Sequence, residues 1–152
     1  MKQNPKDIPV QESLRAGILA RDGFLGEDAR PFPQIIREDL EALAALGATA
    51  GEVADAMERL TKAGLTAVGV PVKAGDYSVL VEEYMGRIPC PFRDHRASKR
   101  NTEATDASGR SFAWSDLSIH LIRAHGFFQG AGSPFRLEPA ALADFLGLAK
   151  PS

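Results

Sequence analysis

The pattern of hydrophobic and polar positions divides the chain into a helical first part and a mixed second part. In the first part, apolar residues recur every three or four positions, which is the period of an amphipathic helix. The clearest stripe consists of Ile36, Leu40 and Leu43. Leu14 and Ile18, which are four positions apart, predict a short additional helix over residues 11–20.

The second clear helix is predicted to begin after Thr49 and to close at Gly64. Thr49 and Glu52 have the spacing of a capping box, in which each side chain satisfies a backbone N–H at the helix start. Gly47 lies just past the end of the preceding stripe, where a left-handed cap suits glycine. The two helices are therefore expected to form an antiparallel hairpin with a very short turn.

After Gly64 the apolar period shortens to two, which is the period of a β-strand. Alternating apolar residues at 68–72 and 77–81, separated by a turn at Gly75, predict a β-hairpin. The polar stretch 99–110 predicts a loop or a short exposed hairpin.

Two further helices are predicted in the C-terminal part. Ser115 is a suitable N-cap for the first of them, and Gly126 is expected to stop it. The second is expected to begin near Pro139, because proline is favoured in the first turn of a helix.

Composition is that of a water-soluble globular protein, with 44% hydrophobic and 25% charged residues. No apolar run approaches the roughly 20 residues of a membrane helix. The single cysteine cannot form an internal disulfide, so the fold does not depend on an oxidising compartment. We therefore expect a cytoplasmic protein without a membrane partner.

The only cysteine lies in one short segment with all three histidines of the chain, in the order Cys90, His95, His120 and His125. Zinc prefers four nitrogen and sulfur ligands in a tetrahedron, usually supplied as two close pairs from two distant pieces of chain. The spacing provides two such pairs and predicts a zinc site at these four residues. Separate structural roles, with a buried thiol and unconnected histidines, are the alternative.

Two details of this site stay open. Asp94 competes with His95 as the fourth ligand, because a carboxylate can bind zinc or orient a ligand histidine. His120 and His125 differ by about 140° around an ideal helix, so both can face one ion only if the last turn loosens near Gly126.

Residues 90–125 resemble a C2H2 zinc finger, in which a strand turn supplies the first ligand pair and a helix the second. The four-residue gap between His120 and His125 is within the range of that family. The segment departs from the family in two ways: its first pair is cysteine and histidine, and twenty-four residues separate the pairs. The chain as a whole looks like a bacterial protein.

These predictions combine into an α+β fold with an N-terminal helical hairpin, a small antiparallel sheet and C-terminal helices that carry a finger-like zinc site. We assign residues 1–66 to a helical N-terminal part and residues 67–152 to a β-hairpin plus zinc-binding part. The length of 152 residues suits one domain, so we expect the two parts to form one compact unit.

Charge is unevenly distributed along the chain. Residues 87–136 carry eight basic and four acidic residues, a net charge of +4, whereas the remainder carries −6. The candidate anion-binding residues of this segment are Arg93, Arg96, Lys99 and Arg100. We therefore expect a zinc-stabilised small binding or regulatory protein that contacts nucleic acid or a protein partner, largely by electrostatics.

Two other functions compete with this expectation. A helix-turn-helix over residues 34–63 has a suitable turn, but its second helix opens without side chains that read base edges. An enzyme could use Cys90 as a nucleophile, with Asp94 or Asp116 orienting the base. A metal-dependent hydrolase could instead use Glu103 or Asp106 as its base. The chain contains no established catalytic motif that would favour either enzyme.

Overall fold

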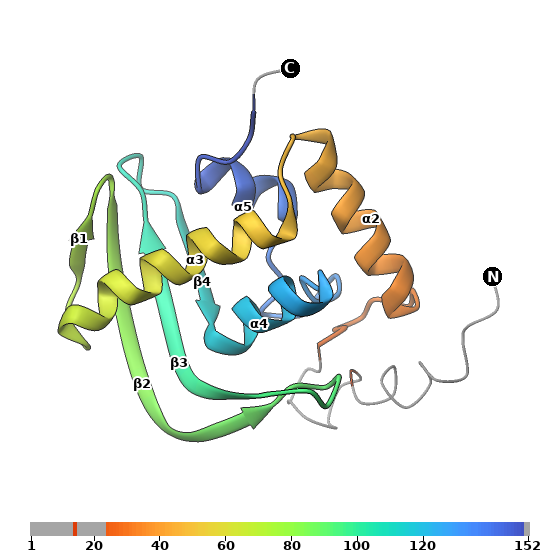
Figure 1. Cartoon of the computed structure of the whole chain (residues 1–152), viewed down its shortest axis with the longest axis horizontal. Coiled ribbons are helices and arrows are strands. Elements are labelled where there is room, and N and C mark those ends of the chain that lie inside the picture. Colours follow the sequence, from red (N-terminus) through yellow and green to blue (C-terminus); the bar gives the residue numbers. More distant parts are fainter. Residues whose placement is uncertain (1–13, 15–23, 151–152) are drawn as a thin grey trace.

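A computed structural model of the chain describes residue 14 and residues 24–150 (Figure 1). These residues form an α+β fold in which helices pack against one four-stranded antiparallel sheet, as predicted. Apart from Leu14, the helix predicted over residues 11–20 lies outside the described residues. None of the helices in the described part of the chain is long and apolar enough to cross a membrane.

The predicted N-terminal hairpin consists of α2 (Phe32–Ala45) and α3 (Ala50–Gly64). Its capping box is present, because the Thr49 hydroxyl accepts a hydrogen bond from the backbone of Glu52, whose carboxylate accepts one from the backbone of Thr49. Gly47, in the turn between the helices, has a φ of 75°. This left-handed conformation is the one for which glycine was expected there.

Gly64 ends α3 as predicted, and it also permits close packing against the sheet. Its φ is −66°, an ordinary helical value. A Cβ atom added to it would lie 2.5 Å from a methyl group of Val81 and 3.0 Å from one of Val79. Glycine therefore allows α3 to lie directly on β2 (Tyr77–Pro89).

The sheet is an antiparallel meander in which each strand pairs with the next along the chain. The other strands are β1 (Val72–Ala74), β3 (Arg96–Thr105) and β4 (Ser111–Ser115). β1 and the start of β2 form the predicted hairpin around Gly75.

The long strand β3 is the main departure from the predicted fold, because it covers more than half of the stretch 99–110 that was expected to be a loop or a short hairpin. Thr102 and Ala104 alternate toward the interior and are buried, while Glu103 between them is exposed. Threonine and alanine carry little apolar signal, so this alternation is hard to recognise in the sequence.

β2 and β3 share a bulge that redirects the end of their hairpin. The register shifts between Glu83 and Arg87, so that residues 84–86 stand opposite Lys99 alone. Beyond this bulge both strands curve and run past α4 (Asp116–His125), as Figure 1 shows. A bulge commonly bends the strand that contains it, and this bend carries the turn between β2 and β3 to the C-terminal end of α4.

Buried apolar side chains form two clusters. The main core lies between α3, the sheet and α5 (Pro139–Phe145) and includes Met57, Val79, Trp114 and Phe128. The second core lies beneath the turn between β2 and β3 and includes Leu14, Phe24, Cys90, Leu121 and Phe127. Because the main core takes residues from both sides of residue 66, the two predicted parts of the chain share it.

Candidate metal centre

Cys90 and Asp94 lie together in a tight turn between β2 and β3. The backbone N–H of Cys90 donates to the carbonyl oxygen of His95 at 2.8 Å, and that of Arg93 donates to the carbonyl oxygen of Cys90 at 2.9 Å. Arg93 has a φ of 64°, a left-handed conformation that few residues other than glycine adopt. We refer to residues 90–95 as the knuckle.

His120 and His125 extend from the last two turns of α4. The helix begins at a capping box in which the Ser115 hydroxyl accepts a hydrogen bond from the backbone N–H of Ser118. It continues through His125, and Gly126 then caps it with a φ of 63°. Both ends of the helix are therefore fixed by local hydrogen bonding, as predicted from Ser115 and Gly126.

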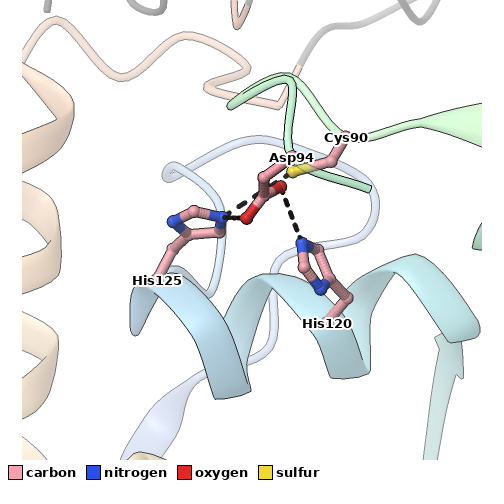
Figure 2. A group of neighbouring side chains, drawn as sticks. All are labelled: Cys90, Asp94, His120 and His125. Carbon is pink, nitrogen blue, oxygen red and sulfur yellow. Dashed lines mark hydrogen bonds and ion pairs between the residues drawn. The ribbon is translucent and has the colours of Figure 1, made fainter. Parts of the chain in front are cut away.

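The carboxylate of Asp94 bridges the two histidines. Its Oδ1 lies 3.0 Å from Nε2 of His120, and its Oδ2 lies 2.8 Å from Nε2 of His125. Figure 2 shows the carboxylate between the two rings, with Cys90 beside it. The two histidines therefore converge although α4 does not loosen before His125, because the two oxygens of one carboxylate span the gap between them.

Hydrogen bonding keeps Asp94 ionised. Partial burial alone would raise its pKa, but hydrogen bonds from Cys90 and His120, together with the charges of both neighbouring histidines, outweigh burial and lower the pKa to about 2. The side chain is 41% exposed, whereas those of His120 and His125 are 18% and 20% exposed. Asp94 therefore places a negative charge on the solvent-exposed side of the group at neutral pH.

Cys90 forms the buried side of the group. Only 1% of the residue is exposed, and its Sγ lies 3.9 Å from Nε2 of His125. Burial, and secondarily the nearby Asp94 carboxylate, raises the pKa of the Cys90 thiol to about 12. The thiol is therefore protonated at neutral pH unless a cation displaces its proton.

Aromatic contacts orient both histidines. Phe92, within the knuckle, stacks on the ring of His125 with a centroid distance of 4.0 Å and an interplanar angle of 12°. His95 stacks on His120 at 4.4 Å and 24°. Phe92 was not among the predicted site residues, although an aromatic residue between two candidate ligands is a signal that could have indicated it.

The structure brings together three of the four predicted ligands and adds Asp94, the alternative fourth ligand. One ligand atom from each of Cys90, Asp94, His120 and His125 lies within 4.8 Å of every other. His95 is not a member of this group and contacts it through the stacked ring of His120. A thiol, a carboxylate and two imidazoles this close together can hold a metal ion.

The four basic residues proposed to bind anions differ in their surroundings. Arg93, Arg96 and Lys99 are exposed. Arg100 instead lies along the interior side of β3, where its guanidinium donates to Oδ2 of Asp116 at 2.7 Å. Arg100 is therefore engaged within the protein, and Arg93 and Arg96, beside the knuckle, remain available to a partner.

The carboxylates considered for catalysis have structural partners or are remote along the sheet. Asp116 pairs with Arg100, although its Oδ1 is buried without a hydrogen bond among the described residues. Asp106 accepts hydrogen bonds from Ser108 and from the backbone of Arg110 in the turn between β3 and β4. Glu103 lies on the exposed face of β3.

Comparison of the chain with protein-family models, with curated proteins and with solved structures found no match. The resemblance of residues 90–125 to a zinc finger therefore stays a prediction. A function for this protein has to be argued from the chemistry and the geometry of its site.

Proposed function

We propose that this protein is a small zinc-stabilised binding or regulatory protein whose zinc ion is held by Cys90, Asp94, His120 and His125. The observation that carries the proposal is the approach of these four ligand atoms, all within 4.8 Å of one another. They come from two separate elements, the knuckle and the end of α4. Four protein ligands are typical of structural zinc sites.

The mixture of ligand atoms favours zinc over other common ions. Calcium and magnesium prefer sites made only of oxygen atoms. A site with one sulfur, two imidazole nitrogens and one carboxylate oxygen suits a borderline-soft ion such as zinc. Zinc would also displace the proton of Cys90, which burial otherwise keeps on the sulfur.

Zinc at this position would stabilise the contact between the knuckle and α4. In the protein itself this contact depends on one half-exposed carboxylate, Asp94, and on ring stacking. An ion bound by residues on both sides would cross-link the two elements. Its binding free energy would then contribute to folding.

The surface beside the site supports an anionic partner. Arg93 and Arg96 line a shallow depression together with Cys90 and His95. Both arginines are exposed and form no ion pair with any residue that the structure describes. Guanidinium groups recognise phosphates and carboxylates well, so nucleic acid or an acidic protein segment suits this surface.

Metal-dependent hydrolysis is the second candidate function. It is favoured by one observation, the 41% exposure of the Asp94 side chain, which lets water reach the centre from one side. A cysteine nucleophile is a weaker candidate, because activated cysteines have lowered pKa values and reachable sulfurs. Burial gives Cys90 the opposite properties.

Metal content of the untagged, purified protein tests the proposal. We expect about one zinc per chain in the wild type and a strong loss in Cys90→Ala and His120→Ala. Asp94→Asn and His95→Gln form a matched pair, because both residues lie in the knuckle but only Asp94 belongs to the group of close ligand atoms. Asp94→Asn should lose metal and His95→Gln should retain it.

Two results would contradict this assignment. Metal well below one ion per chain in the wild type, even after zinc is added and the excess removed, would exclude the site. Metal loss in His95→Gln with retention in Asp94→Asn would instead make His95 the fourth ligand.

Binding to labelled single- and double-stranded nucleic acid at two salt concentrations tests the partner. The double variant Arg93→Gln/Arg96→Gln should bind nucleic acid more weakly. Its affinity should also depend less steeply on salt, by the equivalent of up to about two lost phosphate contacts. The charge-matched control is Arg59→Gln/Lys73→Gln, which changes two exposed basic residues on α3 and β1. If both double variants behave alike, the surface beside the knuckle is not the binding site.

A further inference from the structure

A second concave site lies at the bulge of β2 and β3, and none of its lining residues is a candidate metal ligand. It has a volume of about 450 Å³ and we call it the bulge cleft. Phe24, Ile88 and Leu117 contribute apolar surface to it. Tyr84, Met85 and Phe135 also line it and are 54%, 95% and 55% exposed.

The register shift between β2 and β3 builds this cleft. Residues 84–86 stand opposite Lys99 alone, and Gly86 adopts a φ of 95° that lets the strand turn outward there. A Cβ atom added to Gly86 would lie 4.0 Å from the side chain of Lys99. The exposed Tyr84 and Met85 and the amine-bearing chain of Lys99 are therefore brought to one place by the same feature of the backbone.

Lys99 is the only charged side chain among the described residues that line the cleft. It forms no ion pair with any of the described residues. The nearby Ser98 and Asn101 also line the cleft, and neither side chain has a hydrogen-bond partner in the described part of the chain. A cation and unpaired hydrogen-bonding groups beside apolar surface form a site with an anion-binding end.

Gln129 supplies a second, independent indication of a ligand. The residue is only 5% exposed, and it lines the cleft in a left-handed conformation with a φ of 72°. Its Oε1 accepts a hydrogen bond from the Ser133 hydroxyl, whereas its Nε2 has no acceptor among the described residues. Nε2 is not among the fully buried unpaired atoms of the described residues, so it stays accessible in the cleft and can donate a hydrogen bond to a ligand oxygen.

The backbone strain at Gln129 is maintained by a buried ion pair. Arg136 donates one hydrogen bond to the Gln129 carbonyl oxygen at 2.6 Å and two to the carboxylate of Asp39, each at 2.9 Å. Asp39 and the Arg136 side chain are both nearly inaccessible to solvent. Strained residues held by such a rigid surrounding are concentrated at binding sites.

We propose that the bulge cleft binds a small amphipathic carboxylate, a molecule with an alkyl or aryl body and a single carboxylate group. Lys99 and the Gln129 amide would bind the carboxylate, and the apolar side chains would cover the body. The volume lies within the range of small-molecule sites, roughly 300–1,000 Å³. Burial of Met85, Tyr84 and Phe135 by the ligand would remove apolar surface from water, which is the main driving force for such binding.

Decanoate, below its micelle concentration, is a suitable probe, and methionine-methyl carbon-13 NMR is a suitable readout. Met85 is 95% exposed beside the cleft, whereas Met57 is fully buried in the main core and serves as an internal control. We expect decanoate to shift the Met85 resonance and to leave that of Met57 unchanged. The dissociation constant should be on the order of 0.05–1 mM for a ligand of this size.

Two further probes separate the apolar and the electrostatic contributions. Decyltrimethylammonium carries a similar chain with the opposite charge, and acetate carries the carboxylate without the chain. Both should bind at least about tenfold more weakly than decanoate, because each lacks one half of the recognition. Equal binding of decanoate and decyltrimethylammonium would overturn the proposal by showing apolar adhesion only.

Exposed residues allow variants that should still fold. Lys99→Gln should weaken decanoate binding about tenfold, the usual effect of removing a charged hydrogen-bond donor. Lys73→Gln changes an exposed lysine of β1 and is the matched control that should bind as the wild type does. Phe135→Ala should also weaken binding, without a change in the charge of the site. An unchanged affinity in Lys99→Gln, or no shift of the Met85 resonance in the wild type, would refute the proposal.

Discussion

The main core satisfies its polar groups inside the protein, whereas the candidate metal centre leaves its carboxylate and its two histidines partly exposed. In the main core the Thr61 hydroxyl accepts a hydrogen bond from the Trp114 indole at 3.0 Å and lies 2.7 Å from the hydroxyl of Thr102. All three residues are at least 97% buried. In the candidate metal centre, Asp94 is 41% exposed and contacts two histidines that water can also reach.

This difference predicts that the two regions respond to different conditions. A buried network of neutral hydrogen bonds has no ion to lose and no group that titrates near neutral pH. The knuckle and the end of α4, in contrast, converge on groups whose protonation competes with a metal ion. The hydrogen bonds within the main core should therefore be independent of metal, while the contact at the knuckle should depend on it.

The largest expected effect is that of Met57→Ala, which removes a fully buried side chain from the main core. We expect a loss of about 2–5 kcal/mol in the free energy of unfolding, because the cavity adds to the lost burial. A metal chelator should lower the free energy of unfolding by the same amount in this variant as in the wild type. Met57 belongs to the main core and Cys90 to the second, and changes at sites without shared partners act additively. Urea unfolding with and without chelator measures both quantities.

Leu121→Ala provides the matched comparison in the second core. Leu121 is also fully buried, but it belongs to α4 and directly follows His120. Leu121→Ala should change the effect of a metal chelator on stability, because Leu121 supports the proposed ligand His120. If Met57→Ala altered the chelator response and Leu121→Ala did not, the separation of the two regions would be wrong.

Metal removal from the wild type is the next largest effect. At a free zinc concentration about a hundred times the dissociation constant, binding stabilises the folded state by about 2.7 kcal/mol. Chelator should lower the melting temperature correspondingly, and Cys90→Ala should melt at the same temperature with and without it. An unchanged melting curve in the wild type, with metal loss verified by elemental analysis, would argue against a stabilising role.

The sequence contained most of the information about the candidate site, but not which of Asp94 and His95 would join Cys90, His120 and His125. The chain places Cys90, Asp94 and His95 in one turn, and spacing alone cannot say which of the last two side chains joins the close group of ligand atoms. Which side chain joins the group depends on the left-handed conformation of Arg93 and on the backbone hydrogen bond from Cys90 to His95. Both are properties of the folded turn.

The secondary structure was likewise predictable from the sequence only where neighbouring residues decide it. Helix ends with strong local signals, at Thr49, Ser115 and Pro139, lie where they were predicted, because capping is decided by neighbouring residues. β3 was missed because its pairing with β2 and β4 is not local. Its inward-facing Thr102 is polar, and its burial is explained only by the hydroxyl of Thr61 on α3.

A pH effect of intermediate size is expected from Asp28, whose side chain is 4% exposed. Hydrogen bonds from the Arg30 side chain, at 2.5 Å and 2.8 Å, and from the backbone of Ala131 at 2.9 Å keep the pKa of Asp28 well below its ordinary value. A lowered pKa in the folded state stabilises the protein above the unfolded-state pKa of about 3.9, and this contribution is lost as the pH falls further.

Asp28→Asn should therefore destabilise the protein by about 1–3 kcal/mol at pH 7. The difference in the free energy of unfolding between Asp28→Asn and the wild type should decrease below about pH 4, because the stabilising contribution of the wild-type carboxylate is lost there. Urea unfolding across this pH range, with chelator present throughout, measures the effect without a contribution from metal. Glu41→Gln, an exposed position on α2, serves as the control. A difference that stays constant down to pH 3 would show that the charge of Asp28 is unimportant.

The smallest expected effect tests what holds α4 in place. Arg123, which lies between His120 and His125 in the sequence, pairs with Asp55 of α3 at 2.9 Å and with Glu58 of α3 at 2.5 Å. All three side chains are at least 36% exposed, and exposed ion pairs are typically worth less than about 1 kcal/mol. Arg123→Gln should thus lower stability only slightly, with an effect that shrinks further in high salt, and should leave the metal content unchanged. Packing of Leu121 and the capping of α4 would then be sufficient to present both histidines. Loss of metal in Arg123→Gln would mean that this surface ion pair, and not the packing, positions the helix.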